Sequence, residues 1–383
     1  MNFTFYTASK ILFGKDVLTK LGAEIERYGD NFLVVVDPSF ANSKAKDTLL
    51  GQIESIGGKY MVFSEVRGEP TVELIDEVTK LAVENSCNAV ISMGGGSCID
   101  VGKATAACIT NGTPTVDYLE YVGKGKKVTI DPVPFIAIPT TAGTGSEVTK
   151  NAVLGNEAAE FKRSMRDDKM VANMAVLDPM LTVSCPPHVT AHSGIDALTH
   201  AVESFVTFRA TPISDALSLK STEMCGKYLQ RCYDDGSDIE AREGMSAAAL
   251  LAGMAFANSG LGAVHGIAMA VGIRYHVPHG ESCGILLPHI MELNAPHVTE
   301  KMDLIGEALT GKHYDKIGEG SKVAIDFVKK LNAAMGIKPD YKHLGIPEED
   351  YRPLAEASIG TSMKSNPFQM TVDDLIMYFS KIM

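Results

Sequence analysis

Four residues in the second half of the chain form a candidate ligand set for a divalent metal ion. Asp196 and His200 stand four apart in the segment GIDALTHAVESFV, which has no Gly or Pro after Gly194. Four residues make about one helical turn, so both side chains are expected on one face of a helix. His265 and His279 follow in AVHGIAMAVGIRYHVPHG, each beside a glycine and within sequence compatible with helix. A single histidine of this kind is more typical of a helix surface or a satisfied core position, but the four residues together favour a catalytic metal site.

The composition of this set indicates which metal it would hold. One carboxylate and three imidazoles, with no thiolate, suit Fe(II) or Zn. The ligating imidazoles must be neutral, so metal loading is expected to fall in acid.

The length, composition and charge of the chain limit the classes of protein to which it could belong. The chain has 383 residues, which favours two domains. Hydrophobic residues make up 45% and charged residues 21%, as in an ordinary globular enzyme. The net charge is −12 and no long basic run offsets it, so nucleic acid is not expected as a partner. No apolar run reaches membrane-spanning length, so no membrane partner is expected.

The cysteines and the first residues favour a reducing cytoplasm. Seven cysteines are scattered without a CxxC pair, and the opening MNFTFYTASKILFG has neither a basic nor an apolar signal region. Cys98 lies inside a glycine motif and could contact a ligand, whereas buried packing is expected for the other cysteines.

Strands and helices are expected to alternate in the first half of the chain. Short apolar runs occupy residues 32–36, 60–63, 88–93 and 134–139, with helical periodicity between them, as in VELIDEVTKLAVENS. This alternation predicts parallel strands in an α/β layer architecture. The opening FYTASKILFG reads as extended and could form a hairpin before the first α/β unit.

The character of the chain changes near residue 185. The breaker pair in SCPPHV precedes long stretches rich in Ala, Leu and Met that continue almost to the end. We therefore expect an α/β dinucleotide-binding domain at residues 1–184 and an all-helical metal- and substrate-binding domain at residues 185–383.

Polar and glycine-rich loops follow three of the predicted strands. Asp37 follows the run FLVVV, where a carboxylate can bind ribose hydroxyls and repel a 2′-phosphate, although an Asp in Asp-Pro-Ser also starts turns. Gly94-Gly95-Gly96-Ser97 ends another strand and opens a helical segment, which suits a pyrophosphate. The loop PTTAGTGSE at 139–147 follows a third strand, and Ser146 could instead cap a following helix. No GxGxxG occurs, so the usual Rossmann fingerprint is missing.

Together these motifs resemble the iron-containing (group III) alcohol dehydrogenases, which share their fold with glycerol dehydrogenase and dehydroquinate synthase. The resemblance covers essentially the whole chain and includes GGGSCID, IPTTAGTGSEVT, LDPMLT, GIDALTHAVES, GMAFANSGLGAVHG, PHGESCGILLPHIMELN and the late SNP. It implies a two-domain, dehydroquinate synthase-like fold in which NAD and Fe(II) or Zn are bound.

The resemblance also implies a role for individual residues. The family's metal ligands match Asp196, His200, His265 and His279. Its NAD contacts match Asp37, Gly95, Gly96, Ser97, Asp100, Thr140, Thr141, Thr144, Lys162 and the apolar Leu181. Its substrate pocket matches Asn151, Phe256, Leu261, Met269 and Ser362.

One departure concerns the proton that leaves the substrate. Many family members carry a histidine four residues after the third ligand, where this chain has Met269. A methionine cannot transfer a proton, so the relay must use water, a ribose hydroxyl or a neighbour such as His276.

The expected reaction is hydride transfer between the nicotinamide and a small primary alcohol or its aldehyde, with the metal acting as Lewis acid on the substrate oxygen. Arg274 and Arg209 raise a narrower alternative, an aldehyde with a sulfonate or carboxylate tail. A polyol dehydrogenase, a dehydroquinate synthase-like lyase and a non-catalytic NAD-binding scaffold are less favoured, since the full His/His pattern and the TTAGTGSE loop are present. The extended opening segment and the resemblance favour a homodimer or a larger oligomer.

Overall fold

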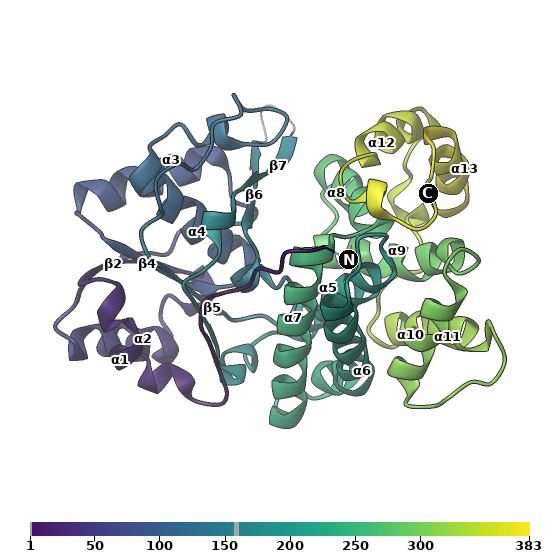
Figure 1. Ribbon diagram of the computed structural model, residues 1–383, viewed down its shortest axis with the longest axis horizontal. Helices are drawn as coiled ribbons and strands as arrows, with labels where there is room; N and C mark the ends of the chain where they lie inside the picture. Colours follow the sequence, from purple (N-terminus) through teal and green to yellow (C-terminus); the bar gives the residue numbers. More distant parts are fainter. Residues whose placement is uncertain (1, 157–160) are drawn as a thin grey trace. The chain divides into compact units, whose positions relative to one another are not determined.

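The computed structural model describes residues 2–156 and 161–383, which divide into two compact units. The sheet unit comprises residues 6–184 and contains every strand of the described chain. The helical unit comprises residues 2–5 and 185–383 and contains helices without strands in its described part (Figure 1). The expected combination of an α/β first half and an all-helical second half is confirmed.

A six-stranded parallel sheet forms the centre of the sheet unit. Its strands are β1 (Ile11–Phe13), β2 (Asn31–Val36), β3 (Lys59–Phe63), β4 (Ala89–Gly94), β5 (Phe135–Pro139) and β8 (Met174–Leu177), in the order β1-β8-β5-β4-β2-β3. Strands β2, β4 and β5 are buried along nearly their whole length, as parallel strands covered on both faces must be. Four of these strands coincide with the apolar runs of the sequence.

The chain opening does not form the hairpin that its sequence suggested, so this prediction is wrong. Strand β1 pairs in parallel with β8, so that Ile11 lies opposite Ala175 and Phe13 opposite Leu177. The partner strand is thus contributed by residues more than 150 positions away, and no local turn is involved. An additional pair, β6 (Asn151–Asn156) and β7 (Phe161–Arg166), is antiparallel and forms a separate two-stranded sheet.

The order of the strands creates a switch point between β2 and β4. From β2 the chain moves outward to β3, returns to the other side of β2 as β4, and then continues to β5 and β8. In open parallel sheets, ligands bind beyond the carboxyl ends of the strands at such a reversal. Helices α1 (Gly22–Ile25), α2 (Lys44–Ser55), α3 (Val72–Glu84) and α4 (Gly96–Asn111) connect and cover the strands. The loops after β2 and β4 are therefore where a dinucleotide is expected.

Nine helices build the helical unit in the described part of residues 185–383. They are α5 (Pro187–Val206), α6 (Pro212–Asp234), α7 (Ile239–Ser259), α8 (Ala263–Tyr275), α9 (His279–Asn294), α10 (Thr299–Thr310), α11 (Glu319–Ala334), α12 (Tyr351–Ser358) and α13 (Val372–Ile382). Helix α5 packs against α6, α7 and α9, and almost all of its second half is buried. It is the central element of the unit.

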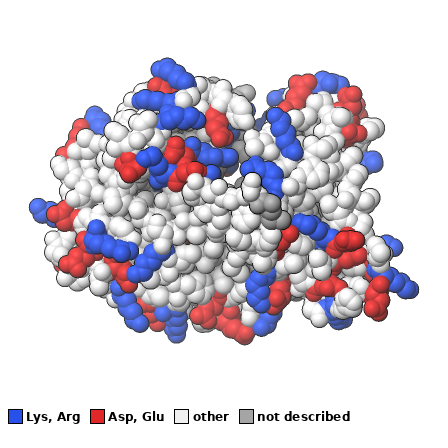
Figure 2. All heavy atoms as spheres, viewed as in Figure 1, with Lys and Arg blue, Asp and Glu red and all other residues white. Residues whose placement is uncertain are grey.

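The helices of the described chain differ from a membrane span in length and hydropathy. No single one of them is long and apolar enough, and only the pair α7 and α8 reaches these values together, with a bend of 99° between them. On the surface, Figure 2 shows lysine and arginine side chains interspersed with aspartate and glutamate over the face drawn.

Candidate metal centre and cofactor loops

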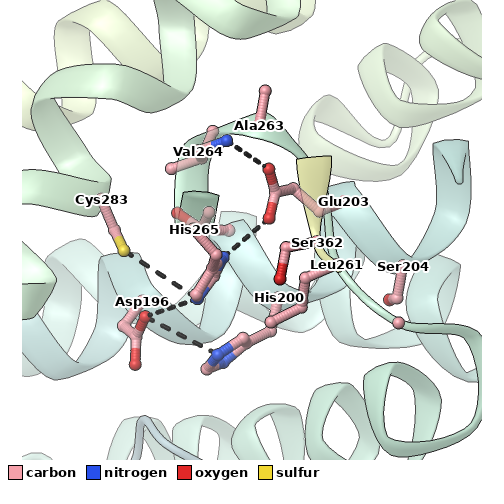
Figure 3. A network of polar contacts seen from close by, with 12 residues as sticks. Asp196, His200, Glu203, Ser204, Leu261, Ala263, Val264, His265, Cys283 and Ser362 are labelled. Carbon is pink, nitrogen blue, oxygen red and sulfur yellow. Dashed lines mark hydrogen bonds and ion pairs between the residues drawn. The ribbon is translucent and has the colours of Figure 1, made fainter. Parts of the chain in front are cut away.

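Helices α5, α8 and α9 bring the four candidate ligands together inside the helical unit. Helix α5 carries Asp196 and His200 one turn apart, while α8 carries His265 and α9 begins at His279. The Nε2 atoms of His265, His279 and His200 lie 3.4, 3.6 and 3.8 Å from Asp196 Oδ1. Figure 3 shows the side chains of Asp196, His200 and His265 converging.

The spacing of these atoms fits a shared ion better than direct hydrogen bonds. Asp196 is 3% exposed, and its Oδ1 has no hydrogen-bond partner. Donor atoms about 2.1 Å from one ion at tetrahedral angles are about 3.4 Å apart, close to the separations observed. Burial alone would raise the pKa of Asp196, but the three imidazoles hold that pKa well below its usual range. A buried, ionised carboxylate facing three imidazoles is a donor set suited to a divalent cation.

The glycines next to two of the histidines allow the helices to approach closely. A Cβ at Gly280 would lie 2.1 Å from the carbonyl oxygen of His192 on α5, and one at Gly266 would lie 2.9 Å from the carbonyl oxygen of Ser358. Larger residues would push α9 away from α5 and α8 away from α12. Gly280 therefore determines how near His279 comes to the ligands of α5, and Gly266 how closely α8 packs on α12.

Glu203 is a functional candidate that the sequence analysis missed. Its side chain is 2% exposed, and Oε2 accepts a hydrogen bond from His265 Nδ1 at 2.7 Å while Oε1 accepts one from Val264 N at 2.6 Å. A carboxylate at Nδ1 leaves the lone pair of Nε2 directed at the cluster. The signal was available, because Asp196, His200 and Glu203 have the spacing of one helix face.

Cys283 is a second residue that the sequence analysis missed. It lies one turn after His279 on α9, fully buried, with Sγ 3.7 Å from His279 Nε2 and 4.0 Å from His265 Nε2. The oxygen, nitrogen and sulfur donors of Asp196, His265, His279 and Cys283 all lie within 4.8 Å of one another. The expected burial of this cysteine is confirmed, but its sulfur also faces two imidazole nitrogens.

The three candidate cofactor loops meet at the switch point of the sheet. The backbone N–H of Asp37 donates to Met93 O at 2.9 Å, and that of Thr140 donates to Gly94 O at 3.0 Å. These bonds continue the pairing of β2 with β4 and of β4 with β5 beyond the strands. Gly95 caps α4, whose first turn includes Gly96 and Ser97 and leaves backbone N–H groups available to an anion.

The glycines keep the side chains of the neighbouring loops close to the backbone. A Cβ at Gly96 would lie 2.8 Å from Thr144 Cγ2, and one at Gly94 would lie 2.9 Å from Asp37 Cβ. At Gly95 the nearest side-chain atom is Thr141 Cγ2, at 3.7 Å, so the space there is not filled by the protein itself.

Three further candidate cofactor residues have defined surroundings in the sheet unit. Asp37 Oδ1 accepts from Ser39 N at 2.9 Å and from Ser39 Oγ at 2.6 Å, so this carboxylate also starts the turn that the sequence suggested. Lys162 on β7 forms an ion pair with Glu69 at 2.5 Å. Leu181 is buried in the core beneath the sheet, beside residues of β2 and β8.

Asp100 belongs to a buried polar network. Its carboxylate accepts hydrogen bonds from Ser146 Oγ and from Val153 N, the latter at 2.9 Å, and lies 3.7 Å from Lys103 Nζ. Lys103 is 1% exposed and donates to Ser146 O, Thr149 Oγ1 and Asn151 O at 2.7–2.9 Å. Ser146 does not cap an α-helix as the sequence suggested, because it begins a 3-10 turn and its hydroxyl bonds Asp100. The network fixes the loop after β5, and the start of β6, to α4.

Glu147 lies in the same loop, and its buried carboxyl group should make the stability of the protein depend on pH. Burial raises the pKa of the Glu147 carboxyl to about 7, although the nearby Lys103 acts in the opposite direction. The folded state thus holds its proton longer than the unfolded state, so stability is lost as pH rises from about 4.5 to about 7. Glu147→Gln cannot ionise, and its free energy of unfolding relative to the wild type should rise over this window by on the order of 3 kcal/mol. Denaturant titrations at pH 5 and 8 measure the change. The exposed Glu84→Gln should show none, and an equal response in both variants would contradict the prediction.

The candidate substrate residues fall in both units. Within the helical unit, the Phe256 ring stacks on the His200 ring with centroids 4.3 Å apart, and Met269 is half-buried on α8, four residues after His265. Leu261 and Ser362 are linked through Ser365, whose Oγ donates to their carbonyl oxygens at 2.8 and 3.0 Å. Asn151 lies at the start of β6 in the sheet unit, with its carbonyl bonded to Lys103.

The two arginines that suggested an anionic substrate, and the histidine named as a possible proton relay, lie near the surface. Arg274 donates to both carboxylate oxygens of Asp350, with Nε 3.0 Å from Oδ2, so its charge is already matched. Arg209 is exposed on the turn after α5. His276 is exposed at the left-handed end of α8.

Comparisons with known proteins give one family. The description "Iron-containing alcohol dehydrogenase" matches residues 8–179, and "Fe-containing alcohol dehydrogenase family, C-terminal" matches residues 190–383. "Alcohol dehydrogenase 4" of Schizosaccharomyces pombe is 34% identical over 99% of this chain and 89% of its own length. The "NAD-dependent methanol dehydrogenase" of Bacillus methanolicus is 32% identical over 97% of each chain. A crystal structure of 1,3-propanediol oxidoreductase superposes with a TM-score of 0.94 at 29% identity and covers all of both chains.

These matches span both units, and the ligand cluster and the glycine loop lie inside the matched ranges. The chain therefore belongs to the iron-containing alcohol dehydrogenase family, and it is an oxidoreductase that acts on alcohols with NAD and a divalent metal ion.

Proposed function

We propose that the protein interconverts a small primary alcohol and its aldehyde, with NAD bound at the loops after β2, β4 and β5. The divalent ion would be Fe(II) or Zn held by Asp196, His200, His265 and His279. The observation that carries this proposal is the buried Asp196 Oδ1 with three imidazole Nε2 atoms at 3.4–3.8 Å. Lone histidines of a helical core would not share one unpaired carboxylate oxygen.

Each group in the proposed site has a separate task. When bound, the ion supplies Lewis-acid polarisation of the substrate oxygen, and the nicotinamide supplies or takes up the hydride. Asp196 brings the negative charge that balances the ion, and Glu203 holds His265 in the tautomer whose Nε2 can donate a lone pair. Phe256 covers one face of His200 and excludes water from it. Met269 cannot accept the hydroxyl proton, so that proton leaves through water or a ribose hydroxyl.

A neutral, short substrate agrees with the lining and with the relatives. Phe256, Leu261 and Met269 are apolar, and Arg274 already pairs with Asp350. The names of two relatives refer to methanol and to 1,3-propanediol, both of which are primary alcohols. An aldehyde with an anionic tail is therefore the second choice.

The test is NADH oxidation by metal-stripped protein to which Fe(II), Zn(II) or no metal is restored. The panel contains short neutral, hydroxylated and anionic aldehydes, and NADPH is tried in parallel. We expect metal-dependent turnover of neutral short aldehydes with NADH, and weaker turnover with NADPH because Asp37 repels a 2′-phosphate. Turnover confined to secondary polyols or to anionic aldehydes would overturn the substrate class. Binding of NADH without turnover of any aldehyde would overturn the reaction.

Gly95 provides a direct test of the proposed pyrophosphate site. Its backbone angles, φ −72° and ψ −176°, are open to any residue, and an alanine Cβ would make only ordinary contacts at 3.7 Å or more. Gly95→Ala should therefore lower the free energy of unfolding by no more than about 1 kcal/mol. It should still weaken NADH binding at least about tenfold, or about 1.4 kcal/mol, because the methyl group occupies the space of the ligand. Fluorescence titration of NADH measures this, with Gly51→Ala on α2 as the control. Unchanged affinity would place the cofactor elsewhere.

The assembly and the compartment are also proposed. Strand β1 lies at the edge of the sheet, and an uncovered edge favours pairing with a second copy, so we propose a homodimer or larger oligomer. None of the seven cysteines, all of them in the described part of the chain, is part of a disulfide, which agrees with a reducing cytoplasm. Light scattering coupled to gel filtration tests the assembly, and a monomeric mass would contradict it.

A further inference from the structure

Cys283 has an environment that core packing does not explain. Helix α9 presents His279 and Cys283 one turn apart toward the cluster, just as α5 presents Asp196 and His200. Figure 3 shows the Cys283 sulfur directed at His265, next to Asp196. A buried cysteine normally packs as a small apolar side chain, whereas this sulfur faces two imidazole nitrogens and a carboxylate oxygen.

The distances fit a sulfur and nitrogens bound to the same ion. A Zn–S bond is about 2.3 Å and a Zn–N bond about 2.1 Å, so S and N atoms at tetrahedral angles are about 3.6 Å apart. Cys283 Sγ lies 3.7 Å from His279 Nε2 and 4.0 Å from His265 Nε2. Together with Asp196, these atoms form a group whose members all lie within 4.8 Å of one another. The sulfur is thus already placed within bonding reach of an ion shared with the two imidazoles.

We propose that Cys283 is a further protein ligand of the metal, bound through its sulfur as a thiolate. This inference rests on the proposed metal site. On binding, the S–H bond breaks, the proton passes to solvent and a metal–sulfur bond forms, with no change of oxidation state. A thiolate is a soft donor, so it moves the preference of the site from Fe(II) toward zinc compared with a set of one carboxylate and three imidazoles.

The decisive experiment is X-ray absorption at the zinc edge of the full-length protein loaded with one zinc per chain. We expect one sulfur neighbour at about 2.3 Å in the wild type, and nitrogen and oxygen neighbours alone in Cys283→Ser. The matched control is Cys225→Ser, which removes an equally buried thiol on α6 and should keep the sulfur neighbour. With Co(II) in place of zinc, a sulfur-to-metal charge-transfer band in the near ultraviolet should appear in the wild type and the control and be absent from Cys283→Ser.

Metal competition gives a second readout that does not depend on activity. Against a chelator, Cys283→Ser should bind zinc at least tenfold more weakly than the wild type, while the loss of Fe(II) affinity should be smaller. Wild-type zinc surrounded by nitrogen and oxygen alone would overturn the proposed ligand and leave the metal site intact. A wild type that retains no metal would overturn both. The wild-type spectrum decides the question even if the serine variant does not fold.

Discussion

Replacing Asp196 by asparagine should abolish metal retention and lower kcat/KM by about a thousandfold or more. The residue supplies the only carboxylate oxygen among the four candidate ligands, and that oxygen lies 3.4–3.8 Å from three imidazole nitrogens. The amide has nearly the same shape but carries no charge, so a divalent ion would lose its charge balance in a buried site. A thousandfold loss corresponds to about 4 kcal/mol, which a Lewis acid at the reacting oxygen can supply. Metal content after dialysis and steady-state NADH oxidation measure the two effects.

The controls separate loss of metal from loss of fold. Asp196→Asn should still bind NADH with wild-type affinity, because the loops that hold the cofactor belong to the sheet unit. His188→Gln, an exposed change on the same helix, should keep both metal and activity. An Asp196→Asn enzyme that retains its metal and turns over at more than a tenth of the wild-type rate would refute the role proposed for this carboxylate.

Much of the fold was predictable because its strong signals are local. The runs at 32–36, 60–63, 88–93 and 134–139 are apolar for most of their length, since parallel strands are covered on both faces. The pairing of β1 with β8 was not predictable in the same way. Strand β1 has only three residues, and its partner lies more than 150 positions away, so no turn or spacing in the sequence indicates that the two strands pair. Local pattern instead favoured a hairpin that does not form.

The candidate site was predictable to the extent that its residues follow a helical period. Asp196 and His200 stand one turn apart on α5, and the spacing alone places them on one face. Cys283 has the same relation to His279, but a cysteine in apolar sequence reads as core until α9 is seen packed on α5 through Gly280. The buried Lys103 was missed because its bonds reach carbonyl and hydroxyl groups of residues 146–151, which sequence does not bring near α4.

Glu203→Gln should weaken metal binding by about 10- to 100-fold and reduce kcat/KM by a similar factor. The carboxylate can only accept, so His265 Nδ1 must donate, and Nε2 is left with a lone pair for the ion. A glutamine can accept from Val264 N with its oxygen, but its amide nitrogen then faces Nδ1. Two donors meet unless the imidazole moves its proton to Nε2, where it blocks the metal. The substitution thus changes the tautomer of His265, while the imidazole ring keeps its position.

A carboxylate that orients His265 gives a response to added metal that a merely structural residue would not give. Excess Zn(II) or Fe(II) should restore most of kcat in Glu203→Gln, because the barrier lies in metal binding, while the metal concentration for half-activity rises. Glu292→Gln on α9, which removes an exposed carboxylate paired with Lys329, should leave that concentration unchanged. If Glu203 served only to hold the start of α8, the variant would unfold more easily in denaturant and its folded fraction would bind metal as the wild type does. Added metal therefore distinguishes an orienting carboxylate from a packing one.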